Sequence, residues 1–268
     1  MDVFASIMAP FKWLVSALMV WFHDALSSIG MSAANGWTWT FSIIGLVLVI
    51  RAALIPVFLR QVNAQRRMRL LQPDLKKLQD KYKGKTDQLS RQAMAQEQMA
   101  LYKQHGTNPF SACLPMLIQV PFFFALFQVL SGITSAARQD QGIGAMSHQQ
   151  VVQFDESSIL GAPLSASVLH GGAGDQAAVI VLTVLMILAM TASQFMTQRR
   201  TMARSMPEDS ARSMAEDSAD DPLLRQQRMF LYILPVVFGV GGILFPIGVL
   251  IYWTITNLWT LAQQFFVK

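Results

Sequence analysis

The apolar run over residues 38–59 is long enough to cross a membrane, yet it carries one charge, Arg51, in its interior. About 20 apolar residues are needed for a helix to span a bilayer. A guanidinium stays charged at any accessible pH, and placing it at bilayer depth costs about 3 kcal/mol or more. Because such a charge is tolerated where it faces a protein-enclosed or water-filled cavity, Arg51 predicts a functional cavity in a membrane protein.

The composition agrees with this assignment. Hydrophobic residues make up 53% of the 268 positions and charged residues only 14%, against about 25% charged in a typical soluble domain. The single cysteine, Cys113, excludes an internal disulfide and a cysteine-based zinc site. The sequence therefore predicts an all-α, polytopic membrane protein.

Five apolar runs predict five transmembrane helices, and they lie at residues 38–59, 112–133, 177–196, 229–244 and 247–265. The last two runs are separated only by a turn at Phe245 and Pro246, so they form a tight hairpin. Residues 38–265 are thus predicted to form one membrane-embedded core.

The basic residues are distributed unevenly about these helices. Residues 60–108 hold eleven Lys and Arg, residues 199–228 hold six, and Lys268 follows the last helix, whereas the other side has only Lys12 and Arg138. Eighteen against two is a strong bias, since Lys and Arg favour the cytoplasmic side. We expect the N-terminus outside and the C-terminus in the cytoplasm.

Residues 1–37 form the predicted extracytoplasmic N-terminal segment. Apolar residues recur there at three- and four-residue steps, namely Phe11, Leu14, Val15, Leu18, Phe22, Leu26 and Ile29. Lys12, Ser16, His23 and Ser27 fall on another face, so the period predicts an amphipathic helix. We interpret it as lying on the outer leaflet with its tryptophans at headgroup depth. A sixth span and an uncleaved signal anchor are the alternatives.

Three segments connect the predicted helices. Residues 60–107 predict a cytoplasmic helical hairpin. Its coiled-coil-like seam comprises Leu71, Leu75, Leu78 and Tyr82 on the first helix, and the inner side of the return helix comprises Leu89, Ala93, Met94, Ala100 and Leu101. Its basic residues either dock an anionic partner or only satisfy the charge rule. Residues 134–176 predict an extracytoplasmic surface loop with a short helix near residues 149–154. The acidic cytoplasmic loop over residues 198–226 is predicted to be disordered.

The sequence contains no recognisable catalytic constellation. Its four histidines, His23, His105, His148 and His170, are assigned to surface segments or helix ends, without a second ligand at metal spacing. Glycine-rich phosphate loops and protease motifs are absent, and the five predicted spans contain no Asp, Glu, Lys or His. We therefore expect no enzyme activity, cofactor, metal or small-molecule substrate.

Uncharged polar side chains also occur within the predicted spans, and they are Gln119, Gln128, Gln194, Thr254, Thr256 and Asn257. Each can be explained by interhelical hydrogen bonding worth less than about 1 kcal/mol, or by lining a cavity. Arg51 differs from them because no carboxylate in any span can pair with it. An unpaired guanidinium must be hydrated, which favours a wet cavity within the bundle.

Three motifs resemble the YidC/Oxa/Alb insertase family. Residues 108–127, NPFSACLPMLIQVPFFFALF, resemble its second core span, and residues 245–257, FPIGVLIYWTITN, resemble its last span. Arg51 and Pro56, followed by LLQPDL at residues 70–75, are similar to its first core span and hairpin. The resemblance covers about residues 10–265, with the motifs in the family's order.

The resemblance implies a membrane protein insertase that moves client transmembrane segments from the cytoplasm into the bilayer, alone or with the Sec translocon. It implies a hydrophilic groove, open to cytoplasm and lipid, whose candidate residues are Arg51, Gln119, Gln194, Trp253 and Asn257. It also implies a greasy surface along which clients slide, whose candidate residues are Phe123, Phe124, Phe127 and Tyr252. The implied partners are nascent membrane proteins, membrane lipids, and ribosome or signal recognition particle machinery at the hairpin, in a bacterial plasma membrane.

Some features depart from the family pattern. We expect a short form, without a large extracytoplasmic domain, an N-terminal lipobox or a long basic C-terminal tail. Two other classes of membrane protein are alternatives to an insertase. A small-solute transporter would predict inverted repeats, which the order of these spans does not show. A scaffold without insertion activity would share the greasy surface but would have no need of an unpaired intramembrane Arg51.

Overall fold

A computed structural model describes residues 3–85, 87–106, 114–169, 174–205, 239 and 241–266. These residues form helices and one two-stranded antiparallel sheet. Four of the described helices are long and apolar enough to cross a membrane, with spans at Ala5–Ser28, Gly36–Ala53, Ile118–Arg138 and Gln176–Arg200. The predicted all-α polytopic class is confirmed, while the number of spans stays a prediction.

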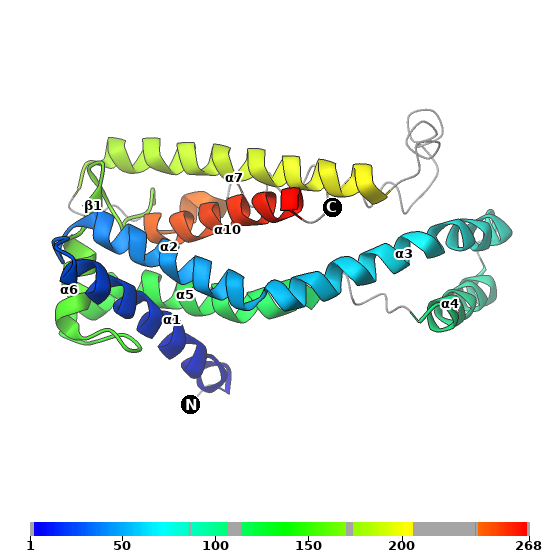
Figure 1. Cartoon of the computed structure of the whole chain (residues 1–268), viewed down its shortest axis with the longest axis horizontal. Coiled ribbons are helices and arrows are strands. Elements are labelled where there is room, and N and C mark those ends of the chain that lie inside the picture. The colour runs from blue at the N-terminus through cyan, green and yellow to red at the C-terminus, as the bar shows by residue number, and fades with distance from the viewer. Residues whose placement is uncertain are drawn as a thin grey trace. The chain divides into compact units, whose positions relative to one another are not determined.

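The chain divides into two compact units, Met1–Ala52 with Pro121–Lys268, and Ala53–Val120. The helices and strands of the first unit are α1 (Val3–Ser28), α2 (Gly36–Ala53), α5 (Leu114–Arg138, from Pro121 on), α6 (His148–Glu156), β1 (Ser158–Ile159), β2 (Ala162–Pro163), α7 (Gln176–Ser205), a 3-10 turn (Gly242–Leu244) and α10 (Ile247–Phe266) (Figure 1). The second unit contains α3 (Ile55–Tyr82) and α4 (Gln88–Gln104). Within the first unit, α7 and α10 pack side by side (Figure 1).

The predicted span over residues 38–59 is interrupted at Leu54, which is a turn between α2 and α3. Pro56 explains the break, since it lies in the first turn of α3, where its missing N–H is tolerated. Further into a helix its ring would clash with the carbonyl four residues earlier. Arg51 consequently lies in the last turn of α2 rather than in the interior of a longer helix.

The other predicted spans have different bounds in the structure. The runs at residues 177–196 and 247–265 lie within α7 and α10, and the described part of residues 112–133 lies within α5. The run at residues 229–244 falls outside the described residues except for 239 and 241–244. Because α7 continues to Ser205, residues 198–205 are helical and the prediction of a disordered loop from residue 198 was wrong; residues 206–226 lie outside the described chain.

The connection between α5 and α7, predicted as a surface loop over residues 134–176, is folded in its described part. The expected short helix is present as α6, and Phe154 from α6 and Leu164 after β2 are fully buried, as are Trp39 and Ile247. The ring of Phe154 packs edge-on against Trp39, 5.2 Å between centroids. Phe154 and Leu164, which lie in a Gly- and Ser-rich stretch of the sequence, make the loop part of the core.

Backbone contacts fix this folded loop to two helices. The amides of Ile247 and Gly248, at the start of α10, donate to the carbonyls of Ala166 and Leu164, each at 2.9 Å. The first amides of a helix lack partners within it, so the loop supplies them. At the start of α2, Gly36 approaches β1 so closely that a Cβ there would lie 2.0 Å from the carbonyl oxygen of Ser158.

Helix α1 packs against the rest of the first unit through a face that only partly matches the predicted one. Most residues of the predicted apolar face are buried or half-buried, but Leu14 and Ile29 are exposed. Ser16 and His23, assigned to another face, are buried. Ser16 Oγ accepts a hydrogen bond of 2.8 Å from the amide of Ala145. Polar side chains can point inward because they find partners there, and apolar ones can point outward where the surroundings are lipid. The outer-leaflet location of α1 stays a prediction.

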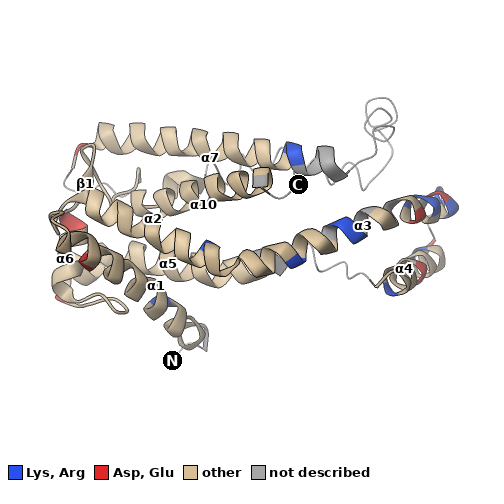
Figure 2. Cartoon of the chain, in the orientation of Figure 1, with Lys and Arg blue, Asp and Glu red and all other residues tan. Residues whose placement is uncertain are grey.

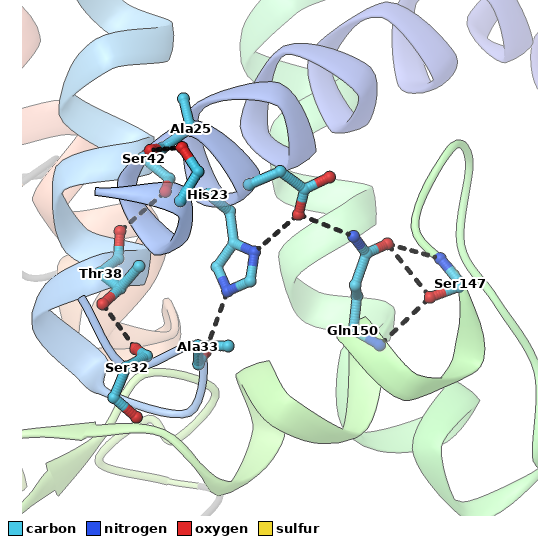
Figure 3. Close-up of polar contacts among 10 residues, drawn as sticks. His23, Ala25, Ser32, Ala33, Thr38, Ser42, Ser147 and Gln150 are labelled. Carbon is cyan, nitrogen blue, oxygen red and sulfur yellow. Dashed lines mark hydrogen bonds and ion pairs between the residues drawn. The ribbon is translucent and has the colours of Figure 1, made fainter. Parts of the chain in front are cut away.

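His23 lies at the centre of a polar network that joins α1, the following loop and α6 (Figure 3). Its side chain is only 2% exposed, so its assignment to a surface segment was wrong. Nε2 lies 2.9 Å from the carbonyl of Ala33 and Nδ1 lies 3.1 Å from Asp24 Oδ1. The same oxygen of Asp24 accepts from Gln150 Nε2 at 3.4 Å, and Gln150 forms a capping box with Ser147 at the start of α6.

The second unit includes two antiparallel helices with many basic residues (Figure 2). Lys81 Nζ on α3 donates to both carboxylate oxygens of Glu97 on α4 at 2.7 Å, and the Tyr82 hydroxyl donates to Glu97 Oε1 at 2.9 Å. Asp87 caps α4 by accepting from the amide of Ser90 at 2.9 Å. These contacts join the two helices next to the turn.

The seam between α3 and α4 follows the predicted positions on α3 and part of those on α4. Leu71 and Leu78 are buried. Of the predicted inner residues of α4, Ala93, Met94 and Leu101 are half-buried, whereas Leu89 and Ala100 are exposed, so these two inward positions were wrong. The same face of α4 carries Glu97, which bonds Lys81 and which the apolar pattern alone did not indicate.

Candidate functional site

Arg51 makes one weak polar contact, with α10. Its Nη2 donates to the carbonyl oxygen of Thr256 over 3.5 Å, the outer limit of a hydrogen bond. Its Nε is buried and has no hydrogen-bond partner, and Arg51 takes part in none of the ion pairs within the described part of the chain. The C-terminal carbonyls of α2 favour a cation at this position. The guanidinium is therefore half-buried, with donors free for water or a guest.

The segment of α10 around this contact has its own unsatisfied polar atoms. Among the described residues, four buried side-chain atoms on it lack a hydrogen-bond partner: Thr254 Oγ1, Thr256 Oγ1, Asn257 Nδ2 and Trp259 Nε1. Buried polar groups are nearly always hydrogen-bonded, and an unmet one costs about 1–3 kcal/mol. Their concentration within two helical turns of the contact with Arg51 is the pattern expected where water completes the hydrogen bonds.

Five aromatic side chains from α5 and the α10 region form a second feature, which we call the aromatic cluster: Phe123, Phe127, Phe245, Tyr252 and Trp253. Phe123 lies 5.6 Å from Trp253 and 6.5 Å from Phe127, between ring centroids. Phe245 packs edge-on at 5.4 Å from Phe127 and at 5.7 Å from Trp253. Phe245 was not among the site residues predicted from the sequence. Its position beside Pro246, at the start of the motif over residues 245–257, was the available signal.

The predicted client surface is only partly on the outside of the protein. Phe124 is 42% exposed, and Phe123 and Phe127 are half-buried. Tyr252 is 2% exposed, so it lies inside the aromatic cluster, 6.4 Å from Phe123, rather than on a surface that a client can touch. The alternation of inward and outward positions around α10 places Tyr252 inward, which composition alone did not reveal.

The remaining groove candidates are placed separately. Trp253 and Asn257 lie one turn apart on α10. Asn257 directly follows Thr256 and Trp253 precedes it by three residues, so both lie within one turn of the residue that Arg51 contacts. Gln194 is half-buried on α7. Gln119 belongs to the second compact unit, Ala53–Val120. The structure thus brings Arg51, Trp253 and Asn257 to one stretch of α10.

Helix α7 meets α10 again near their C-terminal ends. The guanidinium carbon of Arg200 lies 3.7 Å from the ring centroid of Phe265, a cation–π contact. Gln264 Nε2 donates to the carbonyl of Thr197 over 3.4 Å. These contacts hold α10 against α7 on the side of the basic pair Arg199 and Arg200. Within the described residues, no three His, Cys, Asp or Glu side chains gather to form a possible metal site.

Comparison with known proteins identifies the family. Residues 30–268 match the family model described as 60Kd inner membrane protein. A membrane protein insertase YidC of Streptomyces avermitilis is 40% identical over 273 residues, covering 100% of this chain and 59% of that protein. A membrane protein insertase YidC of Tropheryma whipplei is 40% identical over 264 residues, covering 98% of this chain and 84% of that protein.

The chain belongs to the YidC family of membrane protein insertases. A solved structure described as an active YidC insertase with the first transmembrane domain resolved has the same fold, with a TM-score of 0.52 at 22% identity. The alignment covers 100% of this chain and 48% of that one. The chain therefore spans about three fifths of the Streptomyces relative and about half of the solved YidC chain.

Membership in the YidC family confirms the resemblance found in the three motifs. Together with the apolar helices, it makes this a multi-pass protein of the bacterial plasma membrane. The groove candidates lie on α2, α5, α7 and α10, and their assignment to a groove stays a prediction. The sequence could not predict that Arg51 contacts the carbonyl of Thr256, because every residue has a backbone carbonyl.

Proposed function

We propose that this chain is an insertase that moves client transmembrane segments from the cytoplasm into lipid through a hydrophilic groove, alone or with the Sec translocon. The observation that carries the proposal is the half-buried guanidinium of Arg51, with Nε unpaired and Nη2 only weakly bonded to Thr256. A purely structural arginine would be expected to have a carboxylate or several carbonyl partners. Free donors beside unsatisfied groups on α10 suit a wet, polar guest.

In this mechanism Arg51 and the polar stretch of α10 receive the polar segment of a client. Moving an unpaired backbone amide or carbonyl into hydrocarbon costs several kcal/mol per group. Water and polar side chains in the groove lower that barrier by shortening the dry path. Asn257 and Thr254 offer a donor and a hydroxyl on the stretch of α10 that Arg51 contacts, so that the guest's polar groups keep partners during transfer.

The apolar part of the client leaves along the aromatic side of α5. Phe124 faces outward, and Phe123 and Phe127 are half-exposed above the buried ring of Tyr252. Flat rings offer apolar contact area without fixed hydrogen-bond geometry, which suits clients of different sequence. Burial of the client's apolar span in lipid supplies the driving force, at about 25 cal/mol per Å², so the mechanism needs no nucleotide.

The basic second unit is the proposed docking arm for ribosome or signal recognition particle machinery. Its Lys and Arg residues lie along α3 and α4, and Lys83 and Lys85 are exposed at the turn (Figure 2). In the proposed topology the N-terminus is outside and this unit is cytoplasmic, as the bias of eighteen basic residues against two favours. The groove then opens on the side where clients arrive.

The test is insertion of a short single-span client into liposomes that contain only this protein, scored by protease protection of the translocated end. We expect protection above that of empty liposomes, about tenfold lower for Arg51→Leu, which corresponds to about 1.4 kcal/mol of lost barrier lowering. Arg51→Lys should retain most activity, because the groove requires a hydrated charge rather than a fixed guanidinium geometry. Arg138→Leu, at an exposed arginine, is the matched control and should behave as the parent protein.

Two outcomes would overturn the proposal. Full activity of Arg51→Leu would show that the charge is not used, and would favour a scaffold with the same greasy surface. Absence of protection with the parent protein, both alone and with the Sec translocon supplied, would rule out insertion altogether. Protection only with the translocon would leave the groove proposal standing in its Sec-dependent form.

A further inference from the structure

The tip of the β1–β2 hairpin has an unexpected residue. Leu160 has φ +51° and Gly161 has φ +86°. Two successive positive φ values are those of a type I′ turn, whose first central position favours Asn, Asp or Gly. A leucine is disfavoured there because its Cβ crowds the following carbonyl in the left-handed conformation. Leu160 is also 72% exposed, so packing within the protein does not explain it.

The hairpin tip lies against the first turns of α7. A methyl group placed on Gly161 would lie 3.5 Å from Cβ of Ala178, in ordinary van der Waals contact. Gly174, just before α7, approaches so closely that a Cβ there would lie 2.4 Å from Cδ of Pro163 on β2. These two approaches fix the height of Leu160 along the axis of α7.

The sequence of α7 sets where that height falls in the bilayer. The apolar span Gln176–Arg200 has 25 residues, and its charges, Arg199 and Arg200, are at its C-terminal end. At 1.5 Å per residue it is about 37 Å long, somewhat more than the hydrocarbon thickness of about 30 Å. Asp175, immediately before this span, therefore lies near one surface, and Ala178 lies about 4.5 Å further in. Gly161 lies beside Ala178, so its neighbour in the turn, Leu160, is near the boundary between headgroups and hydrocarbon.

The outer surface of α7 is already lipid-facing in composition. Its exposed side chains in this part are apolar, and they are Ile180, Val181, Val184, Leu185 and Leu188. Leu160 continues this surface at its end, on a different element of the chain. The exposed leucine is thus adjacent to a surface that the bilayer covers, rather than to bulk water.

We propose that Leu160 inserts its side chain into the bilayer at the surface nearest the N-terminus of α7 and anchors the hairpin to lipid. The unfavourable turn conformation is offset by burying a leucine among acyl chains. The anchor holds the folded loop between α5 and α7 in place, and thereby keeps Leu164 and Phe154 in the core of the first unit. The inference rests on the membrane position of α7 and is independent of the groove.

A fluorescent probe on a single cysteine tests this. In a Cys113→Ala background, Leu160→Cys is labelled with an environment-sensitive dye in proteoliposomes. Quenching by spin-labelled lipid is compared with that of Val181→Cys, on the lipid-facing surface of α7, and of Glu156→Cys, at the exposed end of α6. We expect the probe at residue 160 to be quenched by lipid as at residue 181 and shielded from aqueous iodide. Iodide quenching equal to that at residue 156 would overturn the proposal, as would shielding from both quenchers, which would indicate a second copy or another protein.

A second measurement separates anchoring from turn conformation. Leu160→Asn places a residue that tolerates positive φ in the turn, so without a lipid anchor it should slow amide hydrogen exchange in residues 157–163. If Leu160 holds the hairpin to lipid, the same substitution should speed that exchange in nanodiscs, by a few-fold, although the turn itself is better satisfied. Unchanged or slower exchange would contradict the anchor.

Discussion

The imidazole of His23 stacks on the indole of Trp39, with ring centroids 3.9 Å apart and planes inclined by 21°. The same imidazole contacts the carbonyl of Ala33 and the carboxylate of Asp24 through its two nitrogens. One side chain thus ties α1 to α2 by stacking and to the intervening loop by hydrogen bonding. The contact holds α1 at a fixed rotation about its axis.

We expect His23→Phe to keep the stacking on Trp39 but to leave the carbonyl of Ala33 without its partner. The loss should be about 1–3 kcal/mol of unfolding free energy, as for an unmet buried acceptor. Thermal unfolding in detergent measures it, with His105→Phe, at an exposed histidine on the second unit, as the control. A variant as stable as the parent would show that stacking alone positions α1.

Gly36→Ala should destabilise the first unit, because the new Cβ would lie 2.0 Å from the carbonyl oxygen of Ser158. Backbone shifts forced by overpacking cost about 1–3 kcal/mol. Gly241→Ala is the control, since no atom of the described residues lies within 4 Å of a Cβ at that position, and it should be neutral or slightly stabilising. Equal midpoints for the two variants in thermal unfolding would contradict the close approach of α2 and β1.

The pair of α3 and α4 should lose stability at both ends of the pH scale. Hydrogen bonds from Lys81 and Tyr82 hold the pKa of Glu97 below its ordinary value, and the bond to Glu97 raises the pKa of Lys81. Because the pKa of Glu97 is lowered, its ion pair stabilises the folded form at pH values above the ordinary pKa of a carboxyl, and this stabilisation is lost as the pH falls through the lowered pKa. Because the pKa of Lys81 is raised, its stabilisation is present at pH values below the ordinary pKa of an amine and is lost as the pH rises through the raised pKa.

Glu97→Gln tests the acid limb. Amide hydrogen exchange in residues 76–104, corrected for intrinsic rates, should increase between about pH 6 and pH 3 in the parent protein and change less in the variant. Lys81 is exposed, and Glu97 and Tyr82 are only half-buried, so the effect is small and local to this pair of helices. Parallel pH profiles for parent and variant would show that the ion pair contributes nothing.

Phe245→Ala should loosen the packing of α5 against α10. The ring makes edge-on contacts with Phe127 and Trp253, and each aromatic pair contributes about 0.5–1.5 kcal/mol beyond its area. We expect a lower thermal midpoint than for Phe195→Ala, at an exposed phenylalanine of α7. We also expect weaker insertion, because the proposed client surface rests on this cluster. Unchanged stability and insertion would remove Phe245 from the site.

The helices could be predicted well from the sequence because they depend on local patterns. Apolar length located α2, α5, α7 and α10, and the lone charge at Arg51 indicated where to look for a polar site, whose use stays a prediction. The break at Leu54 was also encoded locally, by Pro56, but the apolar run continues through it. Hydropathy averaged over a window of residues does not detect such an interruption, although the proline breaks the helix there.

Features that depend on distant contacts were not predictable in this way. The burial of Ser16 and His23 follows from partners at Ala145 and Ala33, which no periodicity indicates. Likewise, Leu164 is a single apolar residue in a polar loop of the sequence, and its burial is evident only from the contact of the loop with α10. In a membrane protein the outside is apolar too, so the usual rule that apolar faces point inward does not orient α1.

The hydrogen bonds from Ile247 and Gly248 to the carbonyls of Ala166 and Leu164 also determine the order in which the protein can be completed. The ribosome makes α10 after every other described element, so these two carbonyls and the side chain of Leu164 lack their native partners until α10 has been made. A nascent chain that stops before α10 cannot reach the native arrangement of the loop.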